Sequence, residues 1–471
     1  MDDEDYSLSS SSTYTGSVTT TDQDDQDFPY LLDDLSENDI SDIIIDIYDQ
    51  FSDFLKNNVL MLSSPTFYKT MFETIGQVIY CEWIDADLYG DISEEEEDEL
   101  FEELVDFVEQ VWEVYSDFCV IPMRSISYEN LHSIRDEKIN INVDDITNKI
   151  QLLKNLPQPA QRTPAWYEFR NNLISASSLS KVFGSDSQVN SLIYEKCCPI
   201  DPNSVDFSRT NLESAAHWGV KYEPITVMIY EDLFHTKVGE FGCIQHQKFG
   251  FIGASPDGIN IDPKSTRYGR MLEIKNIYNR DITGIPKEEY WVQTQMQMEV
   301  CDLEYCDFME TRIKEYSSET DYYTDLSSDK YEYKGIVLHF IETNSKSSTV
   351  NQPHYKYVPL HLDRTEQNVW IQEMRDSCKV DGLVLFRTLY WYLDEYSCVL
   401  VPRNRFWFEA ALPKIKTVWD TIVKERTDGY EHRAPKKKAL KNTIVTADTS
   451  GNTYQIENLN FNKSICLVKL D

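Results

Sequence analysis

The chain of 471 residues has room for two or three domains, and with 41% hydrophobic residues it can bury a sizeable core. No apolar run reaches the ~20 residues of a membrane-crossing helix, and the acidic start MDDEDYSLSS is unlike a signal peptide, so we expect a soluble, intracellular protein with no membrane partner. The ten cysteines are scattered. Cys301 and Cys306 come nearest to a cluster, and we expect no iron–sulfur centre.

The net charge of −37 argues at first against a nucleic-acid partner, because phosphate binding favours a basic surface. The acidity is concentrated at one end, however. Residues 1–150 hold 38 Asp/Glu and 6 Lys/Arg, whereas the remaining 321 residues hold 43 acidic and 38 basic side chains. The larger part of the chain is therefore close to neutral and can carry a basic groove.

The N-terminal third divides into two predicted parts. Residues 1–29 are rich in Ser, Thr and Asp and predict a disordered acidic tail. Residues 30–154 predict an acidic helical region, with amphipathic spacing clearest over 39–54 and 94–115. A solvated acidic surface is the simpler interpretation of this region, and mimicry of DNA or docking of a basic partner is the alternative.

A mixed α/β region is predicted over 155–345, after a proline-containing linker at 155–162. Thr163 and Pro164 form a favourable helix start, and a second helix is predicted over 215–233. Further on, the pattern predicts a helix over 287–300. It also predicts strands at 238–246, 249–254, 271–277, 308–313 and 335–341. We expect a central mixed sheet flanked by helices.

A helical C-terminal region that packs on the core is predicted over 346–430. The prediction rests on the segments VWIQEMRD, FRTLYWYLDEY and RFWFEAALPKIKTVWDTIV. Residues 431–471 then form a basic segment, RAPKKKALK at 433–441, and a tail. The basic segment has three open interpretations: a DNA contact, a nuclear import signal and a solvated loop.

Two short motifs carry the predicted chemistry, IGASPDGI at 252–259 and LEIKN at 272–276. Alternation along a strand points Glu273 and Lys275 to one face and Ile274 to the other. Asp257, arriving across a hairpin, can place its carboxylate beside that of Glu273. A divalent cation relieves the repulsion between two close carboxylates, and oxygen ligands suit Mg²⁺, with Mn²⁺ as a substitute. For Glu273 and Lys275 alone, a surface salt bridge would be the alternative.

These motifs resemble the PD-(D/E)xK nuclease core, and their neighbours resemble its lambda-exonuclease branch, the YqaJ-type viral recombinases. Four further pieces occur in that branch's order: WYEFR with ISAS at 166–177, WGVKYEP at 218–224, SPDG at 255–258 and YWVQTQ at 290–295. The resemblance implies a restriction-endonuclease-like α/β core with helical N- and C-terminal additions. The additions resemble the extended versions found in large DNA viruses.

The resemblance also implies roles for the matching residues. Asp257, Glu273 and Glu223, with the backbone carbonyl of Ile274, would bind two Mg²⁺ ions, and Lys275 would act at the phosphate. Arg170 would clamp a 5′-terminal phosphate with its forked guanidinium. The remaining DNA and 5′-phosphate contacts would come from Ser177, Ser255, Gln293 and Tyr290. For Glu223 an exposed helix carboxylate is the alternative, and for Ser177 a plain helix cap.

A Mg²⁺-dependent deoxyribonuclease is the expected function, most simply a 5′–3′ exonuclease on double-stranded DNA in viral-type recombination, replication or repair. The alternatives are a structure-selective endonuclease or resolvase on the same core, and a non-catalytic DNA-binding or virion protein. The expected partners are duplex DNA ends, a single-strand annealing protein and further copies of the chain in a trimeric ring. Cytoplasm, virus factory or virion is the expected location, with the nucleus an option given by the basic segment.

One departure from the phage pattern is the long stretch between Asp257 and Glu273. It carries Lys264, Arg267 and Arg270. We expect an extended hairpin whose cations contact the DNA backbone.

Overall fold

The computed structural model describes residues 36–85, 93–118, 124–127, 142–160, 163–200, 214–328, 330–342, 353–435, 444–447 and 453–456. The predicted tail at 1–29 and the lysines of the basic segment lie outside these residues. Contacts divide the chain into two units, Met1–Met61 with Thr66–Pro122, and Leu62–Pro65 with Met123–Asp471. This division falls near residue 122, whereas the sequence pattern placed the end of the N-terminal region at 154. No helix in the described ranges is both long and apolar enough to cross a membrane.

Among its described residues the N-terminal unit contains three α-helices, α1 (Glu37–Asn57), α2 (Phe67–Asp85) and α3 (Glu94–Phe118), and the short η1 (Val59–Ser63) begins at its edge. The helices predicted at 39–54 and 94–115 are confirmed as α1 and α3. Their apolar faces meet around Phe51, Ile75 and Val108, all buried. Helix α2 also lies in the region predicted to be helical, but its amphipathic spacing is less clear because it contacts both α1 and α3 and so lacks a single apolar stripe.

The second unit is built on an eight-stranded sheet within the described ranges, in the order β10-β9-β11-β8-β7-β6-β3, with β1 also paired to β11. Its strands are β1 (Ile126–Ser127), β3 (Val238–Gly239), β6 (Gly258–Asn260), β7 (Met271–Asn276), β8 (Tyr305–Glu315), β9 (Lys334–Glu342), β10 (His354–Tyr357) and β11 (Leu383–Pro402). Strands β7 and β8 run parallel and the other pairs are antiparallel, so the sheet is mixed as expected. A second, three-stranded sheet joins β2 (Ile174–Ser175), β5 (Ile252–Ala254) and β4 (Ile244–Gln245).

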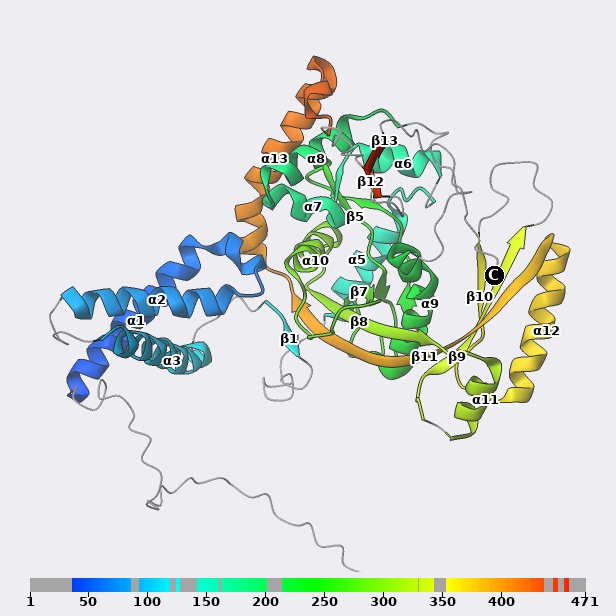
Figure 1. Ribbon diagram of the computed structural model, residues 1–471, viewed down its shortest axis with the longest axis horizontal. Coiled ribbons are helices and arrows are strands. Elements are labelled where there is room, and N and C mark those ends of the chain that lie inside the picture. Colours follow the sequence, from blue (N-terminus) through cyan, green and yellow to red (C-terminus); the bar gives the residue numbers. More distant parts are fainter. Residues whose placement is uncertain are drawn as a thin grey trace, which may run out of the picture. The chain divides into compact units, whose positions relative to one another are not determined.

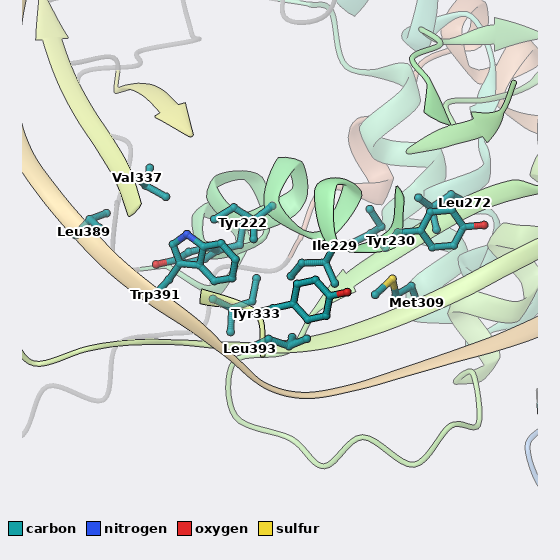
Figure 2. Packing of buried hydrophobic residues seen from close by; sticks show 13 residues of the cluster. Tyr222, Ile229, Tyr230, Leu272, Met309, Tyr333, Val337, Leu389, Trp391 and Leu393 are labelled. Carbon is teal, nitrogen blue, oxygen red and sulfur yellow. The ribbon is translucent and has the colours of Figure 1, made fainter. Parts of the chain in front are cut away.

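Helix α9 (Ala215–Leu233) covers one face of the large sheet and matches the helix predicted over 215–233, and Ser214 caps its first turn. Tyr222 and Ile229 of this helix belong to one buried cluster with Ile274 of β7 and Trp391 of β11. Figure 2 shows Tyr222 of α9 beside Trp391. Helix α10 (Glu288–Cys301) contacts β8 and β5. The side chains of Glu273 and Lys275 turn away from the α9 core and reach residues of α10. The predicted alternation along 273–275 is therefore present.

Further helices surround this framework. They are α5 (Val143–Asn155), α6 (Pro164–Asn171), α7 (Ala176–Phe183), α8 (Asp186–Cys197), α11 (Glu319–Ser328), α12 (Arg364–Val380), α13 (Arg405–Asp428) and the short η4 (Glu431–Arg433). A separate hairpin joins β12 (Ile444–Ala447) and β13 (Thr453–Ile456). Helix α6 begins at Pro164 with Thr163 as its cap, as predicted.

The prediction of an all-helical segment at 346–430 is wrong for its middle part. Residues Leu383–Pro402 form β11, which pairs with β8 along one part and with β9 along another (Figure 1). The segment is dense in Tyr, Trp, Leu and Val, side chains that favour strands, and its apolar spacing was misread as helical. The C-terminal region thus completes the central sheet as well as adding helices α12 and α13.

Candidate active site

Asp257 and the Glu-x-Lys strand meet through a main-chain contact. The short β5 ends at Ala254, and Pro256 leads the chain into β6, whose residues pair with the start of β7. The backbone N–H of Ile274 donates to Oδ2 of Asp257 at 2.7 Å. The half-buried carboxyl of Asp257 is thereby fixed over the middle of the Glu-x-Lys motif.

Glu273 is buried, with 1% of its surface exposed, and three side chains hold its carboxylate. Gln293 donates to Oε1 at 2.7 Å, Gln297 donates to Oε2 at 2.6 Å, and the ammonium of Lys275 forms an ion pair with Oε1. Both glutamines lie on α10, one turn apart. A buried carboxylate needs such partners, since removal from water penalises its charge.

Lys275 lies between the carboxylate of Glu273 and the ring of Tyr290, with its Nζ 4.8 Å from the ring centroid. It also donates to Oε1 of Gln293 at 3.3 Å. Burial alone would lower the pKa of this ammonium, but the negative charges of Glu273 and Asp257 raise the pKa to about 12. Lys275 therefore stays charged at any pH at which the protein would work.

Glu223 approaches from α9, the helix on the opposite face of the sheet. Thr226 and Thr311 both donate to Oδ1 of Asn276, at 2.8 and 2.7 Å, which ties α9 and β8 to the end of β7. This clasp brings the negative charge of Glu223 close enough to act on Asp257. Burial first, then the charges of Glu273 and Glu223, raise the pKa of Asp257 well above the usual range of a carboxyl.

The residues present fit a divalent cation. The charges of Glu273 and Glu223 both act on Asp257, and Ile274, whose N–H binds Asp257, carries a backbone carbonyl in β7. Together these groups offer an oxygen-only donor set of the kind that Mg²⁺ and Mn²⁺ prefer. Within the described ranges, no three His, Cys, Asp or Glu side chains already surround one point as a finished metal site. Glu273 instead faces the glutamines of α10. Binding of a cation would therefore have to draw these carboxylates together.

A second cluster surrounds Arg170 at the end of α6. Its Nη2 donates to Oγ of Ser175 at 3.2 Å and to Oγ of Ser177 at 3.4 Å, and its guanidinium lies 4.7 Å from the ring centroid of Trp166. Ser175 is the cap residue of α7, and β2, which contains it, pairs in parallel with β5. This pairing places the Arg170 cluster beside the strand that leads to Asp257.

The backbone around Arg170 is held by two further cations. The buried ammonium of Lys196 donates to the carbonyl of Arg170 at 2.9 Å, and Arg426 of α13 donates to the carbonyls of Asn171 and Lys196, both at 2.7 Å. Burial, together with the nearby charges of Arg170 and Arg426, lowers the pKa of Lys196 to about 8. The result is a cluster of cationic groups with two serine hydroxyls, which an anion would complement.

The structure places the remaining predicted residues as follows. Tyr290 and Gln293 contact Lys275, whereas Ser255 contributes its carbonyl, which accepts from Gln297 at 3.3 Å. Ser177 is exposed at the second position of α7, so Ser175, not Ser177, caps the helix. Three residues with clear roles in the geometry were not among the predicted site residues: Ser175, Gln297 and Asn276. For Gln297 the signal was present, because it shares a helix face with Tyr290 and Gln293.

The prediction that Arg267 and Arg270 contact DNA is wrong. Both are buried, and both form ion pairs with the fully buried Asp307, at 2.5 and 3.5 Å. Arg267 also lies 3.5 Å from the ring centroid of Phe234. The hairpin folds back onto β8 and α9 because Asp307 offers a buried negative charge, and only Lys264 stays exposed. Cys301 and Cys306 are likewise buried, as free thiols.

Sequence comparison finds a family similarity over the region that contains Asp257, Glu273 and Arg170. Residues 165–304 match the model of the YqaJ-like viral recombinase domain, which confirms the predicted family resemblance. An uncharacterized protein of Acanthamoeba polyphaga mimivirus is 28% identical over 306 residues, covering 58% of this chain. The matched region spans about half, 54%, of that relative's own length.

Similar solved structures are exonucleases by their descriptions. One is LHK-Exo, an alkaline exonuclease of Laribacter hongkongensis that has also been solved in complex with dAMP, with 18% identity, a TM-score of 0.31 and coverage of 57% of this chain and 95% of that one. Another is a phage-related exonuclease of Haemophilus somnus, with 11% identity, a TM-score of 0.28 and coverage of 56% and 96%.

Proposed function

We propose that the chain is a metal-dependent nuclease that acts on DNA, and in its finer detail a 5′–3′ exonuclease on double-stranded DNA. The family match over 165–304 supports the class. The observation that carries the proposal is the meeting of Asp257 with the strand β7 that holds Glu273 and Lys275, where burial and two neighbouring carboxylates disfavour the charge of Asp257. A mere surface salt bridge between Glu273 and Lys275 would give no reason for the carboxyl of Asp257 to lie beside them.

The residues of the site have separate tasks in this proposal. A divalent cation, Mg²⁺ with Mn²⁺ as a substitute and two ions at full loading, would supply a Lewis acid and a more acidic water. Asp257, Glu273 and Glu223, with the carbonyl of Ile274, would hold it. Gln293 and Gln297 fix the carboxylate of Glu273. Lys275, charged throughout the working pH range, offsets the negative charge that develops on the scissile phosphate.

The Arg170 cluster would give the enzyme its direction. A terminal phosphate is a dianion with several acceptor oxygens, which suits a guanidinium flanked by the hydroxyls of Ser175 and Ser177. Because β2 and β5 are paired, a 5′ end bound at Arg170 would lie beside β5, the protein strand that leads to Asp257. Ser255, Gln293 and Tyr290 would contact the DNA between the two clusters.

The test is a digestion of end-labelled linear duplex and of covalently closed circular duplex with added Mg²⁺. We expect the linear DNA to be degraded from its 5′ ends and the circle to stay intact, and we expect neither DNA to be cleaved in controls with EDTA. Cleavage of the circle at an equal rate would favour the endonuclease alternative. Full activity of an Asp257→Ala variant would overturn the assignment of the site. A single-strand annealing partner and a trimeric ring stay predictions.

A further inference from the structure

Helix α6, which carries Arg170, buries none of its own side chains. It is eight residues long, and every residue from Pro164 to Asn171 is exposed or half-buried. A helix of this length is marginal on its own, and most of the stability of a helix comes from burying an apolar face. The position of α6, and with it the direction of Arg170, therefore depends on contacts at the ends of the helix.

The C-terminal end of α6 is held by two side chains from elsewhere in the chain. The ammonium of Lys196 donates to the carbonyl of Arg170 at 2.9 Å. Arg426 donates from Nη2 to the carbonyl of Asn171 at 2.7 Å and, from Nη2 and Nε, to the carbonyl of Lys196 at 2.7 and 3.0 Å. The last carbonyls of a helix have no partner within it and carry a partial negative charge, which a cation satisfies. Arg426 thus joins the ends of α6 and α8, next to Arg170.

Arg426 belongs to a helix that is firmly packed. Helix α13 buries a row of side chains that includes Ile415, Val418 and Ile422, and it contacts α7, α8 and α10 (Figure 1). The guanidinium of Arg426 lies near the end of this helix, 5.5 Å from the ring centroid of Trp419. A well-buried helix therefore supports the cation that holds the weakly buried α6.

The same helix also contacts the strand that leads to Asp257. Trp419 stacks on Phe251, with the ring centroids 6.4 Å apart and the ring planes at 20°. Phe251 directly precedes β5, and its carbonyl accepts from the N–H of Ile174 at 2.8 Å. Through Arg426 and Trp419, α13 therefore fixes the end of α6 relative to β5.

We propose that Arg426 is a positioning residue for recognition of the 5′ end: it holds the end of α6 so that the guanidinium of Arg170 faces the terminal phosphate. All three nitrogens of Arg426 donate to the main chain or to Oδ1 of Asn172, which lies at 3.3 Å, so its own guanidinium is already engaged. It would act through Arg170 and not on the phosphate. The inference rests on the proposed function, and it assigns a role to a helix outside residues 165–304.

The test measures how strongly the full chain prefers a 5′-phosphoryl end when it binds DNA. Two fluorescein-labelled hairpin duplexes, one with a 5′-phosphate and one with a 5′-hydroxyl, are titrated by fluorescence anisotropy in EDTA, so that no metal-dependent cleavage occurs. The ratio of the two dissociation constants gives the preference. We expect Arg426→Ala to reduce this ratio about three- to thirtyfold, a coupling typical of residues that share one network. Arg426→Lys keeps a cation at the helix end and should restore part of the ratio.

A double-mutant cycle separates action through Arg170 from a direct contact with DNA. Arg170→Ala alone should reduce the preference most, and the Arg170→Ala/Arg426→Ala double variant should lose no more than Arg170→Ala does. Two losses that multiply in the double variant would overturn the positioning role, because Arg426 would then act on the DNA by itself.

Two further variants of α13 are the controls. Lys424→Ala removes an exposed positive charge two residues away, and Ile415→Val removes one buried methylene group and destabilises the packing of the helix. A purely structural effect changes the amount of folded protein and leaves a ratio of dissociation constants unchanged, so both controls should keep the ratio of the parent. A drop in Ile415→Val as large as in Arg426→Ala would overturn the specific role of Arg426.

The outcomes separate this inference from the proposed function. A parent-like ratio in Arg426→Ala, with the preference lost in Arg170→Ala, overturns the role of Arg426 and leaves Arg170 in place. An unchanged ratio in Arg170→Ala overturns recognition of the 5′ end at this cluster, and the role of Arg426 with it. Neither result depends on cleavage, so the catalytic assignment of Asp257 is tested separately.

Discussion

Ile274 donates its backbone N–H to the carboxylate of Asp257 at 2.7 Å, so the Pro-Asp turn and the Glu-x-Lys strand are joined by the main chain of the motif itself. The contact uses one oxygen of the carboxyl group as an acceptor, and an amide oxygen can accept the same hydrogen bond. The charge is instead opposed by Glu273 and Glu223. Geometry and electrostatics at Asp257 can therefore be separated by substitution.

Asp257→Asn should keep the acceptor and remove the charge. We expect DNA cleavage to fall by about a thousandfold or more, because a ligand of the catalytic cation is lost. The melting temperature in EDTA should equal or exceed that of the parent, since the repulsion with Glu273 and Glu223 disappears. Added Mg²⁺ should raise the melting temperature of the parent and not of the variant. Differential scanning fluorimetry with and without Mg²⁺ measures the two melting-temperature effects, and a digestion assay measures the cleavage rate.

The exposed Asp281 provides the control for this substitution. Asp281→Asn removes one negative charge without touching the site and should respond to Mg²⁺ like the parent. If Mg²⁺ stabilised Asp257→Asn as strongly as the parent, the cation would bind elsewhere.

The pH dependence of cleavage follows from the raised pKa of Asp257. An ordinary Asp has a pKa of about 3.9. The folded protein holds the carboxyl proton of Asp257 more tightly than that, so a cation that binds Asp257 must displace the proton. Activity should decline, as pH falls, at a pH above the ordinary carboxyl range, and a higher Mg²⁺ concentration should move this decline to lower pH. Without cation, stability should fall as pH rises from the ordinary pKa through the raised one. Rates measured across pH at two Mg²⁺ concentrations test this. A decline that ignores Mg²⁺ would point to a different group.

Arg170 should decide the preference for the chemical state of the 5′ end. Arg170→Ala should reduce the preference for 5′-phosphoryl over 5′-hydroxyl duplex about ten- to a hundredfold, the value of charged hydrogen bonds to a phosphate. Arg170→Lys should restore part of it, because a lysine keeps the charge and loses the fork. Paired digestions of the two substrates give the ratio. The exposed Arg375 of α12 is the control residue, and an unchanged ratio in Arg170→Ala would remove the proposed role.

Local patterns in the sequence determined much of this site. The order apolar–acid–apolar–base in Leu272–Lys275 requires alternate faces on any strand, and Ile274 indeed packs under α9 while Glu273 and Lys275 reach α10. Thr163 and Ser214 cap helices where their side chains and the following residues predict caps. These features depend on a few neighbouring residues, which a sequence displays directly.

Features that depend on distant partners could not be predicted in this way. Leu383–Pro402 becomes a strand because β8 and β9 offer edges on both sides, information that the segment itself does not contain. The position of Ser175 beside the strand that leads to Asp257 depends on the parallel pairing of β2 with β5, whose partners are 78 residues apart in the chain. The largest error concerned the hairpin, whose cations were assigned to DNA because Asp307, 37 to 40 residues further on, is not visible as their partner in the sequence.

The hairpin error leads to a prediction about stability. Asp307→Ala removes the carboxylate that pairs with Arg267 and Arg270 and accepts from Tyr230 at 2.5 Å, all of them buried. Without this carboxylate, two buried guanidinium groups would lie close together with no negative charge between them. We therefore expect the free energy of unfolding, measured by urea titration, to fall by about 3–5 kcal/mol. Arg267→Ala should also be destabilising, yet leave the salt dependence of duplex binding unchanged, because this side chain neutralises no phosphate. Lys264→Ala, on the exposed tip, should leave stability unchanged. A reduced salt dependence in Arg267→Ala, together with full stability, would instead show that the hairpin opens to contact DNA.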